Sequence, residues 1–340
     1  MPYSENSVYS VVKRALIMKK YVLRRLLMMI PLLLGITLLS FVIMQLAPGD
    51  PASLNVAMNS KVDPSYLEKL RQSYGLNDPM MVQYWHWLKR ICTLDFGTSF
   101  KDNRPVLEII GERLPATFLL SGLSLFLLFV LAVPLGVAAA YYQNSWLDRF
   151  VSIFTFVGYS MPGYWFALLL MLLFGVELNL LPISGMISTE ADYLPWYQKI
   201  GDMLSHLILP LVVTTFGGLA SVSLYARTSM LEVIRQDYIR TARAKGLSET
   251  QVIFKHALRN ALIPIVTLMG LSLPGLIGGS FIIETLFAWP GMGQLGLEAV
   301  FTHDYPLLMG IGVITAFLTL FGNLLADLAY AALDPRIRYD

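Results

Sequence analysis

Few side chains in this 340-residue sequence could catalyse a reaction or bind a metal. Zinc sites need converging ligands, and the four histidines lie far apart, at His86, His206, His256 and His303. The single cysteine, Cys92, cannot form an internal disulfide. No G-x-x-x-x-G-K-[ST] motif is present, so the chain lacks a P-loop for the phosphates of ATP. We therefore expect no catalytic residue, no metal and no cofactor.

Two stretches match enzyme motifs by letter only. Gly291-Met-Gly-Gln-Leu-Gly296 has the glycine spacing of a dinucleotide-binding loop, but it follows an apolar segment and Trp289-Pro290 rather than a strand. Gly158-Tyr-Ser-Met-Pro162 resembles a nucleophile elbow in which Pro replaces the last Gly. Ser160 has no evident histidine partner, so we expect a helix break at Pro162 rather than an active site.

The elements that carry these residues are long and apolar. Hydrophobic residues make up 56% of the chain and charged residues 14%, against about 25% charged in a typical soluble domain. Six windows contain no Asp, Glu, Lys or Arg: 26–49, 114–147, 150–176, 203–226, 260–283 and 305–326. A helix of about 20 apolar residues crosses a bilayer. The sequence predicts an all-α integral membrane protein with six transmembrane helices, the second at 116–141.

The distribution of charge predicts the topology, because Lys and Arg in short loops mark the cytoplasmic side. Basic residues dominate in segment 1–25 and in loop 227–260, whereas acids dominate in loops 177–202 and 284–304. We expect both termini in the cytoplasm, segment 1–25 as a cytoplasmic N-terminal segment and loop 50–113 outside. Met18 is a second plausible start of translation, and the sequence does not decide between it and Met1.

The long loop 50–113 has structure of its own. A capping Asp63-Pro64 and a terminal Gly75 predict a short helix between them. The stretch 82–91 is rich in Trp and Tyr, which favour the headgroup level of a membrane. We expect an interfacial helix there, in preference to a direct contact with substrate.

Loop 227–260 is predicted to form a helix, a turn and a second helix. The stretch 232–245 lacks Gly and Pro, and Gly246 favours a helix end. Ser248 and Gln251 form a capping box for the next helix, whose inward face carries Val252, Ile253, His256 and Ala257.

Ionisable groups are nearly absent from the apolar windows, and Asp327 stands at the end of the last one. We expect it to pair with Arg227 or with an arginine of the C-terminal tail, because charges in a bundle are usually paired. A bundle so poor in charge offers little to an ion-coupled carrier. Uphill transport would need energy from another subunit.

The basic loop also carries a resemblance to a known family. The stretch 237–247 and the following His256-Ala-Leu-Arg-Asn-Ala-Leu-Ile-Pro264 resemble the coupling motif of ATP-binding-cassette importer permeases of the peptide and nickel type. Where the general importer motif has Glu-Ala-Ala, this chain has Arg240, Thr241 and Ala242, a departure that peptide-type permeases share. Further similar stretches are Arg24-Arg25-Leu, Ala47-Pro-Gly-Asp-Pro51, Gly158–Pro162, Glu284–Gly293, Asp304-Tyr-Pro306 and Asp334–Arg338.

The resemblance implies a fold, partners and a site. It implies a type I importer permease fold with a six-helix permease domain at 26–340, in a prokaryotic cytoplasmic (inner) membrane. The chain would form half of a path for short peptides and be no enzyme itself. Its partners would be a second permease, ATPase subunits, an external solute-binding protein and membrane lipid, with no nucleic acid. The helix that contacts the ATPase would comprise Asp237, Tyr238, Ile239, Arg240, Thr241, Ala242, Arg243, Ala244, Lys245, Gly246 and Leu247.

Several alternatives stay open at this point. Similar permeases carry nickel complexes, glutathione or other small solutes, and the second permease is either a related chain or a copy of this one. A stand-alone channel or ion-coupled carrier would transport without ATP. An intramembrane enzyme would need a nucleophile and a base that converge, which the sequence does not offer.

Overall fold

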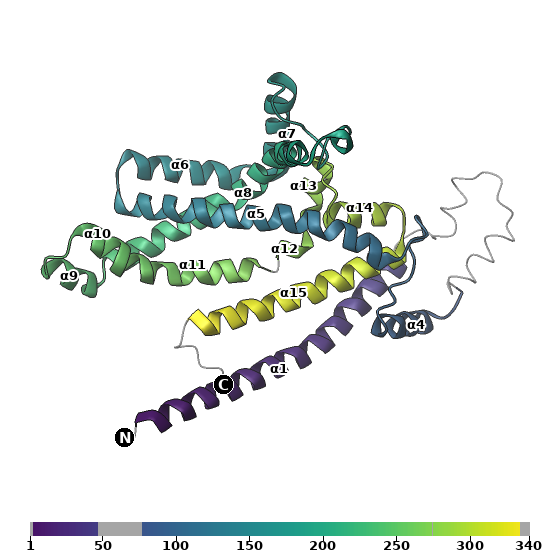
Figure 1. Cartoon of the computed structure of the whole chain (residues 1–340), viewed down its shortest axis with the longest axis horizontal. Coiled ribbons are helices and arrows are strands. Elements are labelled where there is room, and N and C mark those ends of the chain that lie inside the picture. The colour runs from purple at the N-terminus through teal and green to yellow at the C-terminus, as the bar shows by residue number, and fades with distance from the viewer. Residues whose placement is uncertain (1–2, 47–76, 274, 334–340) are drawn as a thin grey trace. The chain divides into compact units, whose positions relative to one another are not determined.

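The computed structural model describes residues 3–46, 77–273 and 275–333 (Figure 1). The elements named in this part of the chain are all helices, which confirms the expected all-α fold. The helix expected between Asp63 and Gly75 lies outside the described residues. The stretches 47–51 and 334–338 lie outside them as well.

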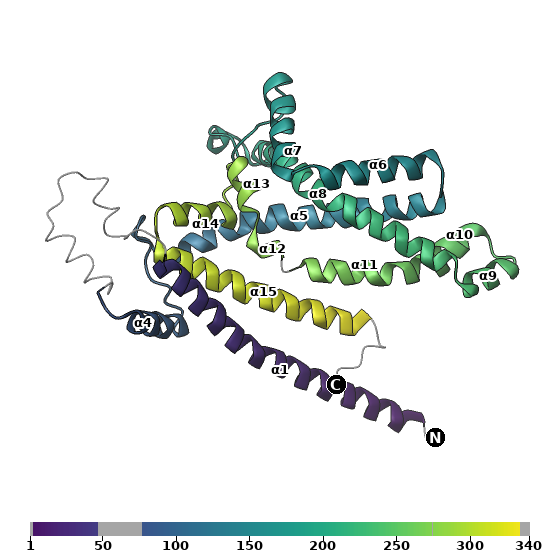
Figure 2. The same cartoon turned by 180° about the vertical axis from the view of Figure 1, so that it is seen from behind.

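The chain divides into two compact units, residues 1–113 with 295–340 and residues 114–294. In the first unit, the long helix α1 (Tyr3–Leu46) packs along α15 (Tyr305–Leu333), and Figure 2 shows this pair from behind. Arg25 of α1 forms an ion pair of 2.8 Å with Asp327 of α15, and the Tyr21 hydroxyl donates to the same carboxylate at 2.9 Å.

The expected pairing of Asp327 with Arg227 is therefore wrong. The guanidinium of Arg227 donates two hydrogen bonds, of 2.6 and 3.0 Å, to the carboxylate of Asp148 instead. Both partners are largely buried, with 20% and 7% of the side chain exposed. The tail arginines lie outside the described residues.

Helix α4 (Met80–Cys92) confirms the helix expected at 82–91. It is attached to α1 by a hydrogen bond of 2.9 Å between the Tyr84 and Thr37 hydroxyls and by one of 2.8 Å from Gln45 to Gln83. Its position at a membrane interface stays a prediction.

The turn before α15 is held by a buried carboxylate, that of Asp304. This group accepts hydrogen bonds from the Ser99 hydroxyl, from the Lys101 amide at 3.3 Å and from the Leu307 amide at 3.2 Å. The Lys101 ammonium pairs with Glu298 in the same unit. The loop before α5 is thus attached to the start of α15.

The second unit contains most of the remaining helices. The first of them, α5, begins in the first unit, and the last, α14, ends there. The helices up to the 227–260 loop are α5 (Val106–Tyr141), α6 (Trp146–Ser160), α7 (Gly163–Leu170), the π-helix η1 (Met171–Glu177), the short η2 (Ala191–Tyr193) and α8 (Trp196–Ile234). After them come α9 (Asp237–Ala244), α10 (Glu249–Gln251), the π-helix η3 (Val252–Ala257), α11 (Leu258–Ser272), α12 (Gly275–Gly278), α13 (Phe281–Leu286) and α14 (Met292–Phe301).

Among the described residues, five helices are long and apolar enough to cross a membrane. A sixth span results if α6 and the following 163–177 segment, bent by 102° between them, are counted together. The bend confirms the break expected at Pro162, which has no amide hydrogen and disfavours helical geometry in the residue before it.

The fifth window differs from the expected 260–283. The continuous apolar helix runs from Glu249 to Ser272, and the chain then breaks into the short α12 and α13. The glycines at 275, 278 and 279 fall in this break, and Gly279 adopts a φ of +61°. Glycine adopts this left-handed geometry without the steric cost that a side chain carries.

Gly136 marks a close approach of α5 and α8. A Cβ atom there would lie 2.3 Å from the Ser223 carbonyl oxygen and 2.6 Å from Ala226 Cβ. Small residues at helix crossings let two backbones pack closely where lipid supplies no hydrophobic drive. The Arg227–Asp148 pair follows one turn later on α8 and joins it to the first turn of α6.

Replacing Gly136 by Ala should destabilise the protein by about 1–3 kcal/mol, because the new methyl group overpacks the α5–α8 crossing. The matched control is Gly122→Ala on the same helix, where a Cβ meets nothing within 4 Å. That change should be neutral or stabilising by up to about 1 kcal/mol, since Ala is the better helix former. Thermal unfolding midpoints in one detergent compare the two. Equal midpoints would contradict the close crossing.

Candidate functional site

The candidate site is the 227–260 loop, in which α9 turns back from the end of α8. The expected single helix over 232–245 is wrong, because α8 ends at Ile234 and α9 begins at Asp237. No Gly or Pro marks this break. The turn instead lets Ile239 and Ala242, the two buried residues of α9, pack against the end of α8.

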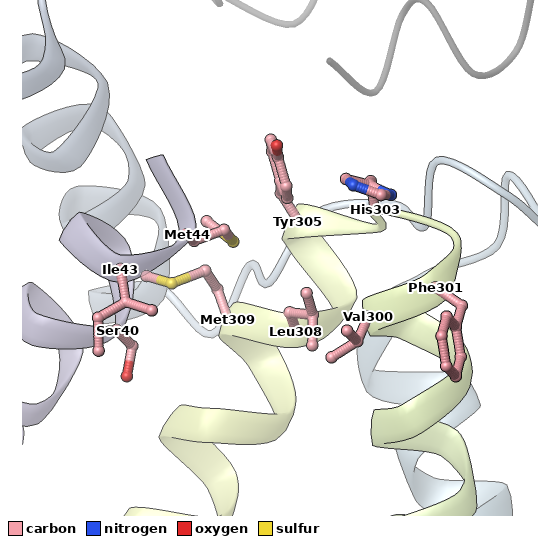
Figure 3. Close-up of a pocket in the computed structure, with 9 residues that line it drawn as sticks. All are labelled: Ser40, Ile43, Met44, Val300, Phe301, His303, Tyr305, Leu308 and Met309. Atoms are coloured by element: carbon pink, nitrogen blue, oxygen red, sulfur yellow. The ribbon is translucent and has the colours of Figure 1, made fainter. Parts of the chain in front are cut away.

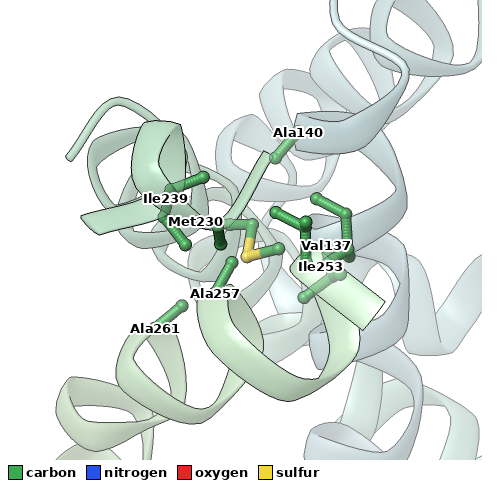
Figure 4. Packing of buried hydrophobic residues seen from close by; sticks show 9 residues of the cluster. Val137, Ala140, Met230, Ile239, Ile253, Ala257 and Ala261 are labelled. Carbon is green, nitrogen blue, oxygen red and sulfur yellow. The ribbon is translucent and has the colours of Figure 1, made fainter. Parts of the chain in front are cut away.

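These two residues belong to a hydrophobic cluster built from five elements. Figure 4 shows the Met230 side chain at the centre of this cluster. Fully burying a side chain such as Ile239 stabilises a structure by about 1.5–3 kcal/mol. The cluster comprises Val137 and Ala140 of α5, Met230 of α8, Ile239 and Ala242 of α9, Val252, Ile253 and Ala257 of η3, and Ala261 of α11. The loop is therefore packed onto the ends of three long helices rather than attached only through its termini.

The end of α9 is formed by a Schellman motif, which confirms the helix stop expected at Gly246. The Gly246 amide donates to the Arg243 carbonyl at 2.9 Å and the Leu247 amide to the Ala242 carbonyl at 3.4 Å. Gly246 has a φ of +78°, a conformation in which a side chain would be strained.

The turn that follows is held by side chains. The Ser248 hydroxyl accepts from the Gln251 amide at 3.4 Å, which confirms Ser248 as a helix cap. Arg243 donates two hydrogen bonds, of 3.1 and 2.6 Å, to the carboxylate of Glu249 across the turn. Of the predicted inward face, Val252, Ile253 and Ala257 are buried, while His256 is half-buried.

All residues from Asp237 to Leu247 other than Ile239 and Ala242 are exposed. Arg240 lies 3.5 Å from Asp237 in a fully solvated pair, which contributes little. Among the residues that the structure describes, Arg235 and Lys245 form no ion pair. The outer surface of α9 therefore carries positive charge beside the partly apolar Tyr238, Ala244 and Leu247.

The other sequence motifs show no sign of chemistry in the structure. The Ser160 hydroxyl donates to the Phe156 carbonyl of its own helix at 2.9 Å. No group of three or more His, Cys, Asp or Glu that could hold a metal occurs in the described part of the chain. The stretch 291–296 comes after the helix α13, and its residues from Met292 onward form the first part of α14.

The first unit contains an apolar cavity of about 560 Å³ between α1, α14 and α15 (Figure 3). Its polar lining is limited to Ser40, His303 and Tyr305, while Ile43, Met44, Val300, Phe301, Leu308 and Met309 form the rest. The lining contains no Asp, Glu, Lys or Arg.

One buried hydrogen-bond network was not predicted from the sequence. The carboxylate of Glu284 is fully buried and accepts hydrogen bonds from the Gly293 amide at 2.7 Å, the Gln294 amide at 3.1 Å and the Thr117 hydroxyl at 3.1 Å. The sequence pattern that could have indicated this network is Glu284 followed by Gly291 and Gly293, because glycines permit a close approach of backbone to a buried group.

Comparison with known proteins agrees with this architecture. Residues 132–339 match a family described as the binding-protein-dependent transport system inner membrane component, and residues 18–121 match the N-terminal region of such membrane components. A chain of the inward-facing MetNI methionine ABC transporter superposes with a TM-score of 0.52 over 67% of this chain and 97% of that chain, at 19% identity. That likeness supports the fold alone.

Curated relatives match over nearly the whole length. The oligopeptide transport system permease protein AppB of Bacillus subtilis is 45% identical over 95% of this chain and 100% of its own. The dipeptide transport system permease protein DppB of Alkalihalophilus pseudofirmus is 38% identical, and the glutathione transport system permease protein GsiC of Salmonella typhimurium is 39% identical. Each match covers 95% of this chain and 100% of the relative. The chain therefore belongs to the binding-protein-dependent transport system inner membrane components, as a multi-pass permease subunit of an ATP-binding-cassette importer in the bacterial inner membrane.

Proposed function

We propose that this permease carries short peptides and forms one half of their path, the other half being a second, related permease chain. The observation that carries the proposal is the 45% identity to an oligopeptide permease over 95% of the chain. A dipeptide permease matches over the same share. The glutathione permease among the relatives keeps glutathione as an alternative solute, and nickel complexes are a further one.

The energy for uptake comes from separate ATPase subunits in this proposal. The chain has no P-loop, and its apolar windows contain no Asp, Glu, Lys or Arg that could carry ions across the membrane. The permease itself therefore performs no covalent chemistry. A solute-binding protein delivers the peptide on the external side.

The contact with the ATPase is assigned to α9 and the turn after it, residues 237–247. A coupling element needs one face for the partner and one for the bundle that it moves. In α9 the bundle face consists of Ile239 and Ala242, and the partner face carries positive charge around Arg240 and Lys245. Since α5, α8 and α11 share the buried cluster, a displacement of α9 shifts the ends of all three.

This assignment fixes the orientation of the chain, because ATP is hydrolysed in the cytoplasm. The 227–260 loop and both termini, including segment 1–25, then lie inside. Loop 50–113 faces outside and is available to the binding protein. The six-helix permease domain occupies residues 26–340.

A photo-cross-linker on position 244 should react with the ATPase subunit. The side chain of Ala244 is exposed, whereas Ala242 is 6% exposed on the same short helix. Each is changed to Cys after Cys92, the single native cysteine, is changed to Ser. A thiol-attached benzophenone in the assembled transporter should then yield a permease–ATPase adduct from A244C and none from A242C. Adducts of A244C that contain only lipid or the permease would contradict the docking of α9.

Uptake of a labelled short peptide should depend on ATP in proteoliposomes that contain both permeases and the ATPase, with binding protein added outside. Excess unlabelled peptide should abolish the signal, and a nickel complex at the same concentration should leave it unchanged. Competition by nickel complexes or by glutathione alone would assign the corresponding alternative solute. Uptake of equal rate without ATP would contradict the importer mechanism.

A further inference from the structure

Helix α5 is attached at one end to η3 and α11 and at the other to the segment 284–294. At one end, Val137 and Ala140 pack with η3 and Ala261 in the cluster beneath α9. At the other end, the indole of Trp289, which is fully buried, donates to the Ala116 carbonyl at 2.8 Å. Thr117 and Val137 are 20 residues apart, or about 30 Å along a helix. The two attachments thus span a distance similar to the thickness of a bilayer core.

The attachment at the Trp289 end depends on the carboxylate of Glu284. It binds Thr117 of α5 and, through the Gly293 and Gln294 amides, the first turn of α14. Thr117 in turn accepts a hydrogen bond of 2.7 Å from the Met292 amide. One buried acid therefore joins α5 to the start of α14 and to α13, on which it lies.

The surrounding backbone is shaped to this carboxylate. A Cβ atom at Gly279 would lie 2.4 Å from a Glu284 oxygen, one at Gly291 2.5 Å, and one at Gly293 3.0 Å. The Gly291 position would also bring a Cβ within 2.5 Å of the Thr117 hydroxyl. Three glycines pack around one acid, which leaves no room for a side chain beside it.

We propose that Glu284 is a positioning residue for transport, which keeps the segment 279–294 fixed to α5 so that both follow a movement of α9 together. This inference rests on the proposed coupling role of α9. The path for the movement runs from the cluster under α9 along α5 to the 279–294 segment. Without the carboxylate, the segment is free to lag behind α5, and ATP hydrolysis no longer produces a matching movement of solute.

The hydrogen-bond pattern predicts which substitution preserves this function. Glutamine fits, since its amide oxygen accepts from the Gly293 and Gln294 amides while its NH₂ group donates to the Thr117 hydroxyl. A neutral group at this position is therefore compatible with the geometry, whereas a methyl group leaves three donors unsatisfied.

The test measures ATP hydrolysed per peptide transported in proteoliposomes with the complete transporter. Glu284→Ala should raise this ratio by about tenfold, within the range that coupling residues reach. Glu284→Gln should stay within about twofold of the unmodified protein. Glu298→Ala removes an exposed acid of α14, whose side chain is 39% exposed, and serves as the matched control.

Two readouts separate the possible failures. The α9 contact is intact if the ATPase co-purifies with Glu284→Ala at the unmodified level and the A244C adduct still forms. An unchanged ratio of ATP hydrolysed to peptide transported then overturns the proposed role of Glu284 and leaves the α9 contact standing. If Glu284→Ala does not fold, Thr117→Val removes both hydrogen bonds of the Thr117 hydroxyl, the one to Glu284 and the one from the Met292 amide, at nearly constant shape. It should raise the ratio about threefold. An unchanged ratio in Thr117→Val, or an equal rise in Glu284→Gln and Glu284→Ala, overturns the proposal.

Discussion

Backbone groups that leave a helix inside a membrane protein must find hydrogen-bond partners within the protein, because lipid offers none. The segment 284–294, which precedes and begins α14, meets this constraint with hydrogen bonds inside the protein. The Trp289 amide donates to the Glu284 carbonyl at 2.7 Å, and the Gly185 amide to the Phe287 carbonyl at 2.7 Å. The carboxylate of Glu284 takes two amides of the first turn of α14. The segment from Glu284 to Gln294 is thus held by hydrogen bonds within the protein.

In the 227–260 loop, a polar helix is exposed outside the bundle and yet firmly packed against it. Only Ile239 and Ala242 of α9 are buried, and they meet a cluster drawn from α5, α8, η3 and α11. The polar bonds around Gly246 and Ser248 then define the turn. A force on the exposed face of α9 is transmitted by packing, since a dense apolar cluster deforms little.

Local features were predictable from the sequence. Composition located the spans except the fifth, which lies at 249–272 instead of 260–283. The break at Pro162, the stop at Gly246 and the cap at Ser248 follow from the chemistry of single residues. The break after Ile234 was not predictable in this way, because it depends on Ile239 finding neighbours from other helices. The same holds for the Arg227–Asp148 pair and for the Thr117–Glu284 bond, whose partners are 79 and 167 residues apart. Only the folded chain brings these groups together.

We conclude that this chain works as one subunit of an ATP-driven importer. Purification of the tagged protein from its native membrane in a mild detergent, with every associated chain identified by mass spectrometry, tests this most directly. We expect a P-loop ATPase and a second multi-pass permease in stoichiometric amounts. Recovery of the chain alone, in a detergent that keeps other membrane complexes intact, would contradict this conclusion.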